Sequence, residues 1–94
     1  MELERKRKEI DELDDSIVRL LQQRVAVARE ISILKLSSGL PIVDAHREND
    51  VLRRVSDDAA HGEAIAAIYR AILNESRRIQ AAAQAEIMDR GVKL

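Results

Sequence analysis

A stripe of apolar residues with helical spacing runs through the first half of the chain and requires one long helix. Apolar side chains recur every three or four positions, at Ile10, Leu13, Ile17, Leu20, Leu21, Val27, Ala28, Ile31 and Leu34. This spacing puts them on one face of a helix. We predict a helix over about residues 3–36. Residues 37–41 end it, because Gly39 fits the left-handed position past a helix end and Pro41 cannot continue a helix.

The predicted helix is too long for a compact monomer of 94 residues. About 34 helical residues span roughly 50 Å at ~1.5 Å per residue. A compact domain of this size has a radius of gyration near ~12 Å. The apolar stripe therefore needs a partner, and a second copy of the chain is the simplest one. We predict an intertwined helical homodimer whose core is complete only after assembly.

Two further helices are predicted in the second half of the chain. The second begins after Asp44, a typical N-cap residue, and runs to about residue 55. A polar turn follows, and a third helix covers about residues 63–89. We therefore predict an all-α fold with a long, a short and a long helix, forming a single domain over residues 1–94.

The charge balance and the missing residue types exclude several classes of function. Basic and acidic residues number 16 and 17 and the net charge is -1, which argues against a nucleic-acid or anionic-membrane partner. Cysteine is absent, and His46 and His61 are too few and too separated to indicate a metal site. No apolar run approaches the roughly 18 residues of a membrane span. We expect a soluble, cytoplasmic protein.

Three cationic residues fall on the apolar stripe or at its edge, where a helix normally carries core side chains. They are Arg7, Arg24 and Lys35, and no acidic residue on the same stripe neutralises them. A buried cation is costly unless an anion pairs with it. One interpretation is that the missing anion is a ligand. The other is that these side chains reach solvent at the edge of a helical bundle.

The spacing of the three cations limits what they can bind together. Eleven residues bring Arg24 and Lys35 back to nearly the same face, with Cα atoms about 16 Å apart. Side chains that each reach roughly 6 Å inward leave room for a small anion with several charges. Arg7 lies about 25 Å from Arg24 along the helix. It can approach Arg24 only from the other chain of an antiparallel dimer; otherwise it is an exposed residue near a helix start.

Polar residues on the two later helices are further candidates for ligand contact. Ser76 and Gln80 share a face and interrupt an apolar series, so they are either ligand-binding residues or a hydrogen-bonded structural pair. Asp44 is an N-cap, and Glu48 is either a first-turn acid or the acceptor for a ligand hydroxyl. Other charged residues are interpreted as solvated and receive no role, namely His46, Arg19, Arg29, Arg53, Arg54, Arg77 and Arg78.

Several short elements follow one another along most of the chain. They are Arg7-x-x-Ile10-x-x-Leu13-Asp14, Leu20-Leu21-x-x-Arg24, Lys35, Pro41-Ile42-x-Asp44-x-x-Arg47-Glu48 and Glu75-Ser76-x-x-x-Gln80. Each element alone is weak, but the ordered set over about residues 4–85 is specific. In these elements the chain resembles the all-helical chorismate mutases of the AroQ class. The resemblance implies an intertwined dimer of three-helix chains with two equivalent sites.

The resemblance also implies a role for each matched residue. Arg24 and Lys35 would hold the substrate carboxylates, with Lys35 also at the ether oxygen. Arg7 would reach a carboxylate across the dimer, Ser76 would assist a carboxylate, and Gln80 would be the second donor to the ether oxygen. The remaining implied contacts are Glu48 at the ring hydroxyl, the backbone around Asp44 and Arg47, and apolar pocket walls at Ile31, Val51 and Leu73.

The reaction implied by the resemblance is the conversion of chorismate to prephenate in the biosynthesis of phenylalanine and tyrosine. This 3,3-sigmatropic rearrangement needs no metal and no cofactor. Two other enzymes on the same scaffold, an isochorismate pyruvate lyase and a 4-amino-4-deoxychorismate mutase, would use much the same carboxylate clamp. Glu48 favours a substrate with a hydroxyl group, and Gln80 fits the mutase. A catalytically silent dimerisation or regulatory module is the alternative from a different class.

Overall fold

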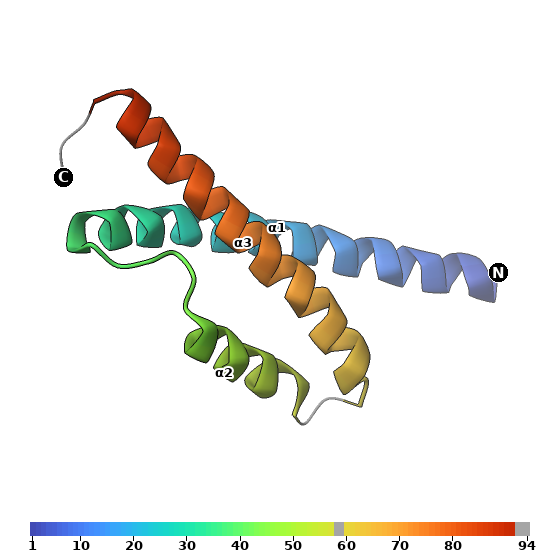
Figure 1. Cartoon of the computed structure of the whole chain (residues 1–94). Coiled ribbons are helices and arrows are strands. Elements are labelled where there is room, and N and C mark those ends of the chain that lie inside the picture. The colour runs from blue at the N-terminus through green and yellow to red at the C-terminus, as the bar shows by residue number, and fades with distance from the viewer. Residues whose placement is uncertain (58–59, 92–94) are drawn as a thin grey trace.

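The computed structural model describes residues 1–57 and 60–91, and within these ranges it contains three helices and no strand. The helices are α1 (Glu2–Ser38), α2 (Ala45–Ser56) and α3 (Gly62–Asp89), as labelled in Figure 1. The all-α prediction is confirmed for this part of the chain. Each helix boundary lies within two residues of the predicted one.

The ends of the helices have the geometry that their sequences predict. Gly39 follows α1 in the left-handed conformation with a φ of 68°. The next N–H, that of Leu40, donates to the carbonyl of Lys35 at 2.8 Å and so satisfies a carbonyl of the last turn. At the start of α2, the Asp44 side chain accepts a hydrogen bond from the Arg47 N–H at 3.0 Å. These caps fix both ends of the short connection between α1 and α2.

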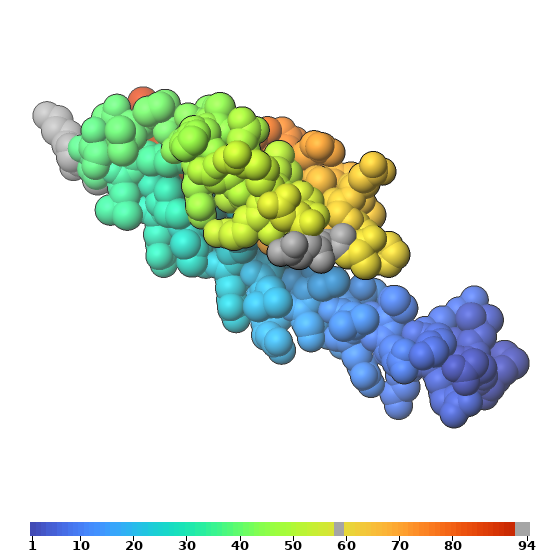
Figure 2. Space-filling model, turned by 90° about the horizontal axis from the view of Figure 1, so that it is seen from below, coloured from blue at the N-terminus to red at the C-terminus, as the bar shows by residue number. Residues whose placement is uncertain are grey.

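The three helices form a thin, elongated body. Helix α3 packs against both α1 and α2, so it joins two helices that do not pack on each other (Figure 1). The N-terminal part of α1 continues beyond this crossing and projects from the rest of the molecule, as the blue segment in Figure 2 shows. The principal-axis extents are 58 × 27 × 13 Å and the radius of gyration is 17.0 Å. A compact chain of this length would have a radius near ~12 Å.

A single chain buries few of its apolar side chains. Among the described residues, the buried ones are Ala28, Val51, Leu73 and Ala83. The stripe on α1 is at least 41% exposed at each of Ile10, Leu13, Ile17, Leu20, Val27, Ile31 and Leu34. An exposed apolar surface of this kind marks a site of interaction with another surface. None of the helices described is long and apolar enough to cross a membrane.

Polar links hold α1 and α3 together near their crossing. Ser32 is fully buried, and its carbonyl accepts a hydrogen bond from Gln84 Nε2 at 2.9 Å. One turn away, Arg29 forms an ion pair with Glu86 at 3.2 Å. Both links run between helices that are far apart in sequence. They therefore help to set the angle at which α3 presents its polar face to α1.

Candidate active site

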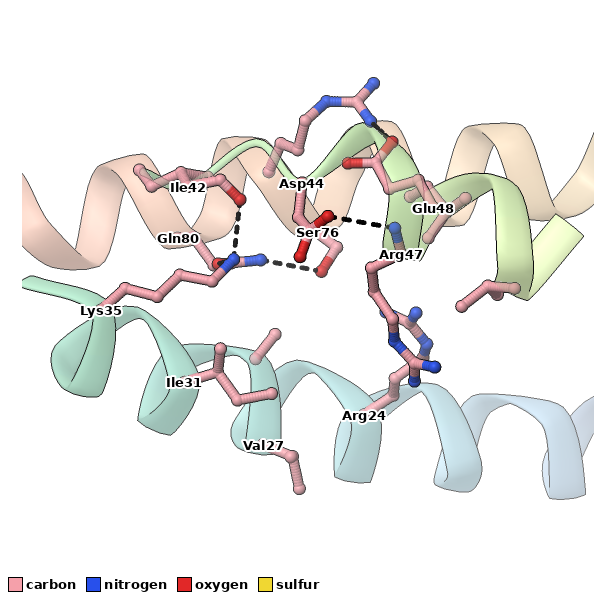
Figure 3. A pocket seen from close by; sticks show the side chains of 14 residues that line it. Arg24, Val27, Ile31, Lys35, Ile42, Asp44, Arg47, Glu48, Ser76 and Gln80 are labelled. Atoms are coloured by element: carbon pink, nitrogen blue, oxygen red, sulfur yellow. Dashed lines mark hydrogen bonds and ion pairs between the residues drawn. The ribbon is translucent and has the colours of Figure 1, made fainter. Parts of the chain in front are cut away.

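A cavity of about 380 Å³ lies between the three helices and is open to solvent. Its size is within the range of about 300–1,000 Å³ that is usual for small-molecule sites. Helix α1 supplies one wall, α2 and the loop before it the second, and α3 the third (Figure 3). The lining residues are Arg24, Val27, Ala28, Ile31, Lys35, Ile42, Asp44, Arg47, Glu48, Val51, Leu73, Ser76, Arg77 and Gln80.

Lys35 is half-buried in the wall formed by α1 and is held by two hydrogen bonds. Its Nζ donates to the carbonyl oxygen of Ile42 at 2.7 Å and to Gln80 Oε1 at 3.2 Å. Both acceptors are neutral, so neither of them compensates the positive charge of the ammonium group. An ammonium has three N–H donors. In the part of the chain that the structure describes, one donor therefore remains unused at the wall of the cavity.

Gln80 is the buried polar residue of the site, with only 7% of its surface exposed. Its Oε1 faces Lys35, and its Nε2 donates to Ser76 Oγ at 3.3 Å. The contact from Lys35 thus fixes which end of the amide carries the donor. An amide NH₂ group has two hydrogens. Gln80 consequently offers a second N–H beside the lysine, in the row that Figure 3 draws from Ile42 to Ser76.

Two guanidinium groups lie toward the other end of the cavity. Arg24 rises from α1 and Arg47 descends from α2, so that the two side chains reach toward one another (Figure 3). Within the described residues neither forms an ion pair with a carboxylate. Like charges at short range repel unless an anion lies between them. Together with Lys35, they give the cavity a concentration of positive charge that matches a ligand with more than one negative charge.

The carboxylates that line the cavity are already engaged. Asp44 caps α2 through the N–H of Arg47. Glu48 Oε1 accepts a hydrogen bond from Arg77 Nη1, which also forms an ion pair with it across α2 and α3. The sequence interpretation of Arg77 as a solvated charge is wrong, because Arg77 is partly buried, lines the cavity and binds Glu48. Its position three residues before Gln80 on the same helix was the signal that could have found it.

The residues predicted as apolar walls line the cavity, whereas the arginine predicted to act across the dimer does not. Ile31, Val51 and Leu73 all line the cavity, and the last two are nearly fully buried. Arg7 is exposed on the projecting part of α1 and does not line the cavity. No group of three or more histidine, cysteine, aspartate or glutamate side chains that could hold a metal ion occurs in the ranges described.

A second cavity, of about 400 Å³, lies between α1 and α3. It shares Arg24, Ala28 and Ser76 with the first cavity. The rest of its lining is mostly apolar, with the residues Leu21, Val25, Ile68, Ala71, Ile72, Glu75 and Ile79. A hydrogen bond from Arg78 lowers the pKa of the Glu75 carboxyl at this edge. Because Arg24, Ala28 and Ser76 line both cavities, the two cavities are neighbours.

One known protein family matches most of the chain. Residues 6–81 match the family described as chorismate mutase type II. The chain belongs to this family. The resemblance predicted from the sequence is thereby confirmed, and the matched segment contains every residue that the resemblance places in the site of a chorismate mutase, from Arg7 to Gln80.

Curated relatives of this chorismate mutase family member match it over shorter parts. A bifunctional chorismate mutase/prephenate dehydratase of Aquifex aeolicus is 36% identical over 80 residues, covering 78% of this chain and 22% of the relative. A chorismate mutase of Methanocaldococcus jannaschii is 37% identical over 49 residues, covering 52% and 50%. A 3-dehydroquinate dehydratase of Pyrobaculum aerophilum is 43% identical over 51 residues, covering 54% and 17%. The chain thus spans half or less of each relative's length. No solved structure matches the chain significantly.

Proposed function

We propose that this domain converts chorismate to prephenate. The observation that carries the proposal is a set of three cations, Arg24, Lys35 and Arg47, that surround one cavity together with the Gln80 amide. Among residues 1–57 and 60–91, no carboxylate forms an ion pair with any of the three. Chorismate is a dianion with two carboxylates, and it matches this excess of positive charge. Membership of the chorismate mutase type II family supports the same reaction.

The first task of the site is to hold the flexible enolpyruvyl arm of the substrate over its ring. Arg24 and Arg47 bind one carboxylate between their guanidinium groups, because a planar fork matches the geometry of a carboxylate. Lys35 binds the other carboxylate, with Ser76 Oγ as an additional donor. Clamping both ends restricts the arm to the compact conformation that reacts. The arm is then already ordered before the reaction, which lowers the activation free energy.

The second task is to stabilise charge that develops on the ether oxygen. In the reaction the carbon–oxygen bond to the ring breaks while a carbon–carbon bond forms, so every atom stays in the molecule. Negative charge grows on the departing oxygen as its bond stretches. Lys35 Nζ lies 3.2 Å from the amide oxygen of Gln80, so the remaining N–H donors of both residues are close enough to serve one oxygen atom. Donors that bind the transition state more strongly than the ground state accelerate the reaction.

The remaining residues of the cavity orient the ring. Glu48 accepts a hydrogen bond from the ring hydroxyl, and the backbone around Asp44 and Arg47 lies beside it at the start of α2. Ile31, Val51 and Leu73 pack against the faces of the ring and keep water from the reacting bonds. This set of contacts requires no metal and no cofactor.

The intertwined homodimer is part of the proposal. The apolar stripe of α1 is exposed in a single chain, and the second cavity is an apolar groove beside it. The projecting part of α1 is long enough to lie across another copy of the chain. In an antiparallel pair it brings Arg7 of the partner toward Arg24, where Arg7 adds a third guanidinium to the carboxylate site. We further propose that the domain comprises residues 1–94 and is cytoplasmic.

Other activities on the same scaffold are distinguished by residues other than the cations. An isochorismate pyruvate lyase and a 4-amino-4-deoxychorismate mutase would use the same clamp, so the cations do not separate them. Glu48 at a hydroxyl position and a neutral Gln80 favour the chorismate mutase. A silent dimerisation module has no use for a cavity in which three cations converge. Turnover of chorismate by the purified protein, followed by the loss of its ultraviolet absorbance, tests the proposal directly.

We expect Arg24→Ala to lower kcat/KM for chorismate by about 10²-fold or more, because it removes a charge-assisted bidentate contact to a carboxylate. Arg24→Lys should recover only a small part of the loss, since lysine cannot form the planar fork. Steady-state kinetics with both variants, and circular dichroism to check folding, make the test. Activity of Arg24→Ala within a few-fold of the wild type would contradict the role of Arg24.

We expect Gln80→Glu to make activity depend on acid pH. A carboxylate at this position would pair with Lys35 and could not donate to the ether oxygen, so kcat/KM at neutral pH should fall by about 10²-fold. Protonation restores an O–H donor, and activity should therefore rise as the pH is lowered. The pH profiles of the variant and the wild type make the comparison. A variant profile that runs parallel to the wild-type profile would argue against contact between Gln80 and the ether oxygen.

A further inference from the structure

Glu48 does not act in the cavity as an isolated carboxylate. Arg77 on α3 binds its Oε1 atom, and the two side chains are partly buried, with 22% of Glu48 and 32% of Arg77 exposed. Arg77 is itself held, because its Nη2 donates to Asn74 Oδ1 at 3.2 Å. The guanidinium is therefore fixed against Glu48 by a contact on its own helix. Partial burial reduces the solvent screening of this charge pair.

The ion pair leaves one carboxylate oxygen for a ligand. Within the described residues, Oε1 is engaged by Arg77 and no hydrogen bond reaches Oε2 of Glu48. A carboxylate oxygen can accept a hydrogen bond from a neutral hydroxyl or from an ammonium group. It binds the ammonium more strongly when its own negative charge is not compensated, because that contact is charge-assisted on both sides. A cation already bound to the carboxylate removes most of this preference.

We propose that Arg77 is a specificity-determining residue that adapts Glu48 to a neutral hydroxyl on the substrate ring and disfavours an ammonium at the same position. This proposal rests on the proposed function, since it concerns the ring contact of the same site. The positive charge of Arg77 acts in two ways. It neutralises the acceptor that an ammonium would need, and it repels a second cation brought into the cavity beside Glu48.

Two ring-substituted substrates separate this role from a structural one. Chorismate carries the hydroxyl, and 4-amino-4-deoxychorismate carries an amino group that is protonated near neutral pH. We expect Arg77→Gln and Arg77→Met to raise the ratio of kcat/KM for the amino compound over chorismate by about tenfold or more. Where turnover of the amino compound is too slow, its inhibition constant against chorismate turnover measures its binding instead, and the neutral variants should lower that constant by about tenfold relative to KM for chorismate. Arg77→Lys keeps the charge and should stay within about threefold of the wild-type ratio.

A matched control comes from α2. Arg53 forms an ion pair with Asp50 at the same i, i+3 spacing that Arg77 and Asn74 have, and neither Arg53 nor Asp50 lines the cavity. Arg53→Met should change neither kcat/KM nor the ratio. A purely structural Arg77 would lower both kcat/KM values together and leave the ratio unchanged, which would overturn the proposal. Two neutral variants are tested, so that if one fails to fold the other still tests the proposal. Absence of chorismate turnover by the wild type would instead overturn the proposed function.

Discussion

Replacing Lys35 by alanine should lower kcat/KM for chorismate by about 10³-fold or more, while the protein stays folded. Lys35 serves both tasks of the proposed mechanism, because it binds a carboxylate and donates to the ether oxygen. Loss of one preorganised donor to a developing oxyanion alone costs about 10²–10³-fold. In the free protein the same change leaves the Ile42 carbonyl and Gln80 Oε1 without a donor. Because the cavity is open to solvent, water can take the place of the lost donor, so the variant should stay folded.

Two comparisons keep this prediction specific. Lys6→Ala removes a lysine from the exposed part of α1, where Lys6 pairs with Glu9 at 3.2 Å, and should leave kcat/KM within about threefold of the wild type. Thermal unfolding of Lys35→Ala, followed by circular dichroism, shows whether the helices persist. A folded Lys35→Ala protein with activity within a few-fold of the wild type would refute the assigned role of Lys35.

Placing a charge on the apolar stripe should abolish activity by a different route. Ile17 is 51% exposed in a single chain, and the proposed homodimer buries it. Ile17→Glu removes an apolar contact worth about 1.5–3 kcal/mol per chain and adds a charge that is costly to bury. We expect the variant to lose the dimer at micromolar concentration and to lose helicity and chorismate turnover with it. Sedimentation equilibrium and circular dichroism measure the two effects.

Gln22→Glu is the matched control for the dimer. Gln22 is exposed on α1, off the apolar stripe, and the substitution adds the same charge. It should leave the molecular mass, the helicity and kcat/KM near wild-type values. A wild-type protein that sediments as a monomer would disprove the dimer, as would an Ile17→Glu protein that keeps full activity. Either result would also remove the basis for a contribution from Arg7 of the partner chain.

The course of the backbone could be predicted from the sequence because its signals are local. The helical spacing of α1, the left-handed Gly39 and the N-cap at Asp44 each depend on residues a few positions apart. These signals predicted the helix boundaries to within two residues. The predicted length of α1 indicated that a single chain would not be compact, and the radius of gyration of 17.0 Å agrees with that inference.

The residues that line the site could largely be predicted from the sequence, but the contacts between them could not. Spacing along one helix predicts that Arg24 and Lys35 share a face, because eleven residues are only slightly more than three full turns. No pattern in the sequence predicts that Lys35 bonds to Gln80, which is 45 residues away, since the crossing of α1 and α3 decides it. The same crossing brings the Ser32 carbonyl against Gln84, 52 residues away, and no local pattern predicts this link.

Arg77 shows why charged residues in a run are hard to interpret. It stands next to Arg78, and a pair of arginines on an amphipathic helix resembles a solvated face. The helix turns by ~100° between them, so Arg77 faces the cavity while Arg78 pairs with Glu75 in solvent. The partner of Arg77, Glu48, is 29 residues earlier in the chain. Only the packing of α2 on α3 brings the two together.

Identification of the product formed from chorismate by the purified protein tests the central claim most directly. We predict that chorismate absorbance falls, that prephenate accumulates in equal amount, and that no pyruvate is released, because the reaction only rearranges bonds within one molecule. Conversion of prephenate to phenylpyruvate by acid supplies an independent assay of its amount. Release of pyruvate, or no turnover of chorismate by a folded dimer, would contradict the account.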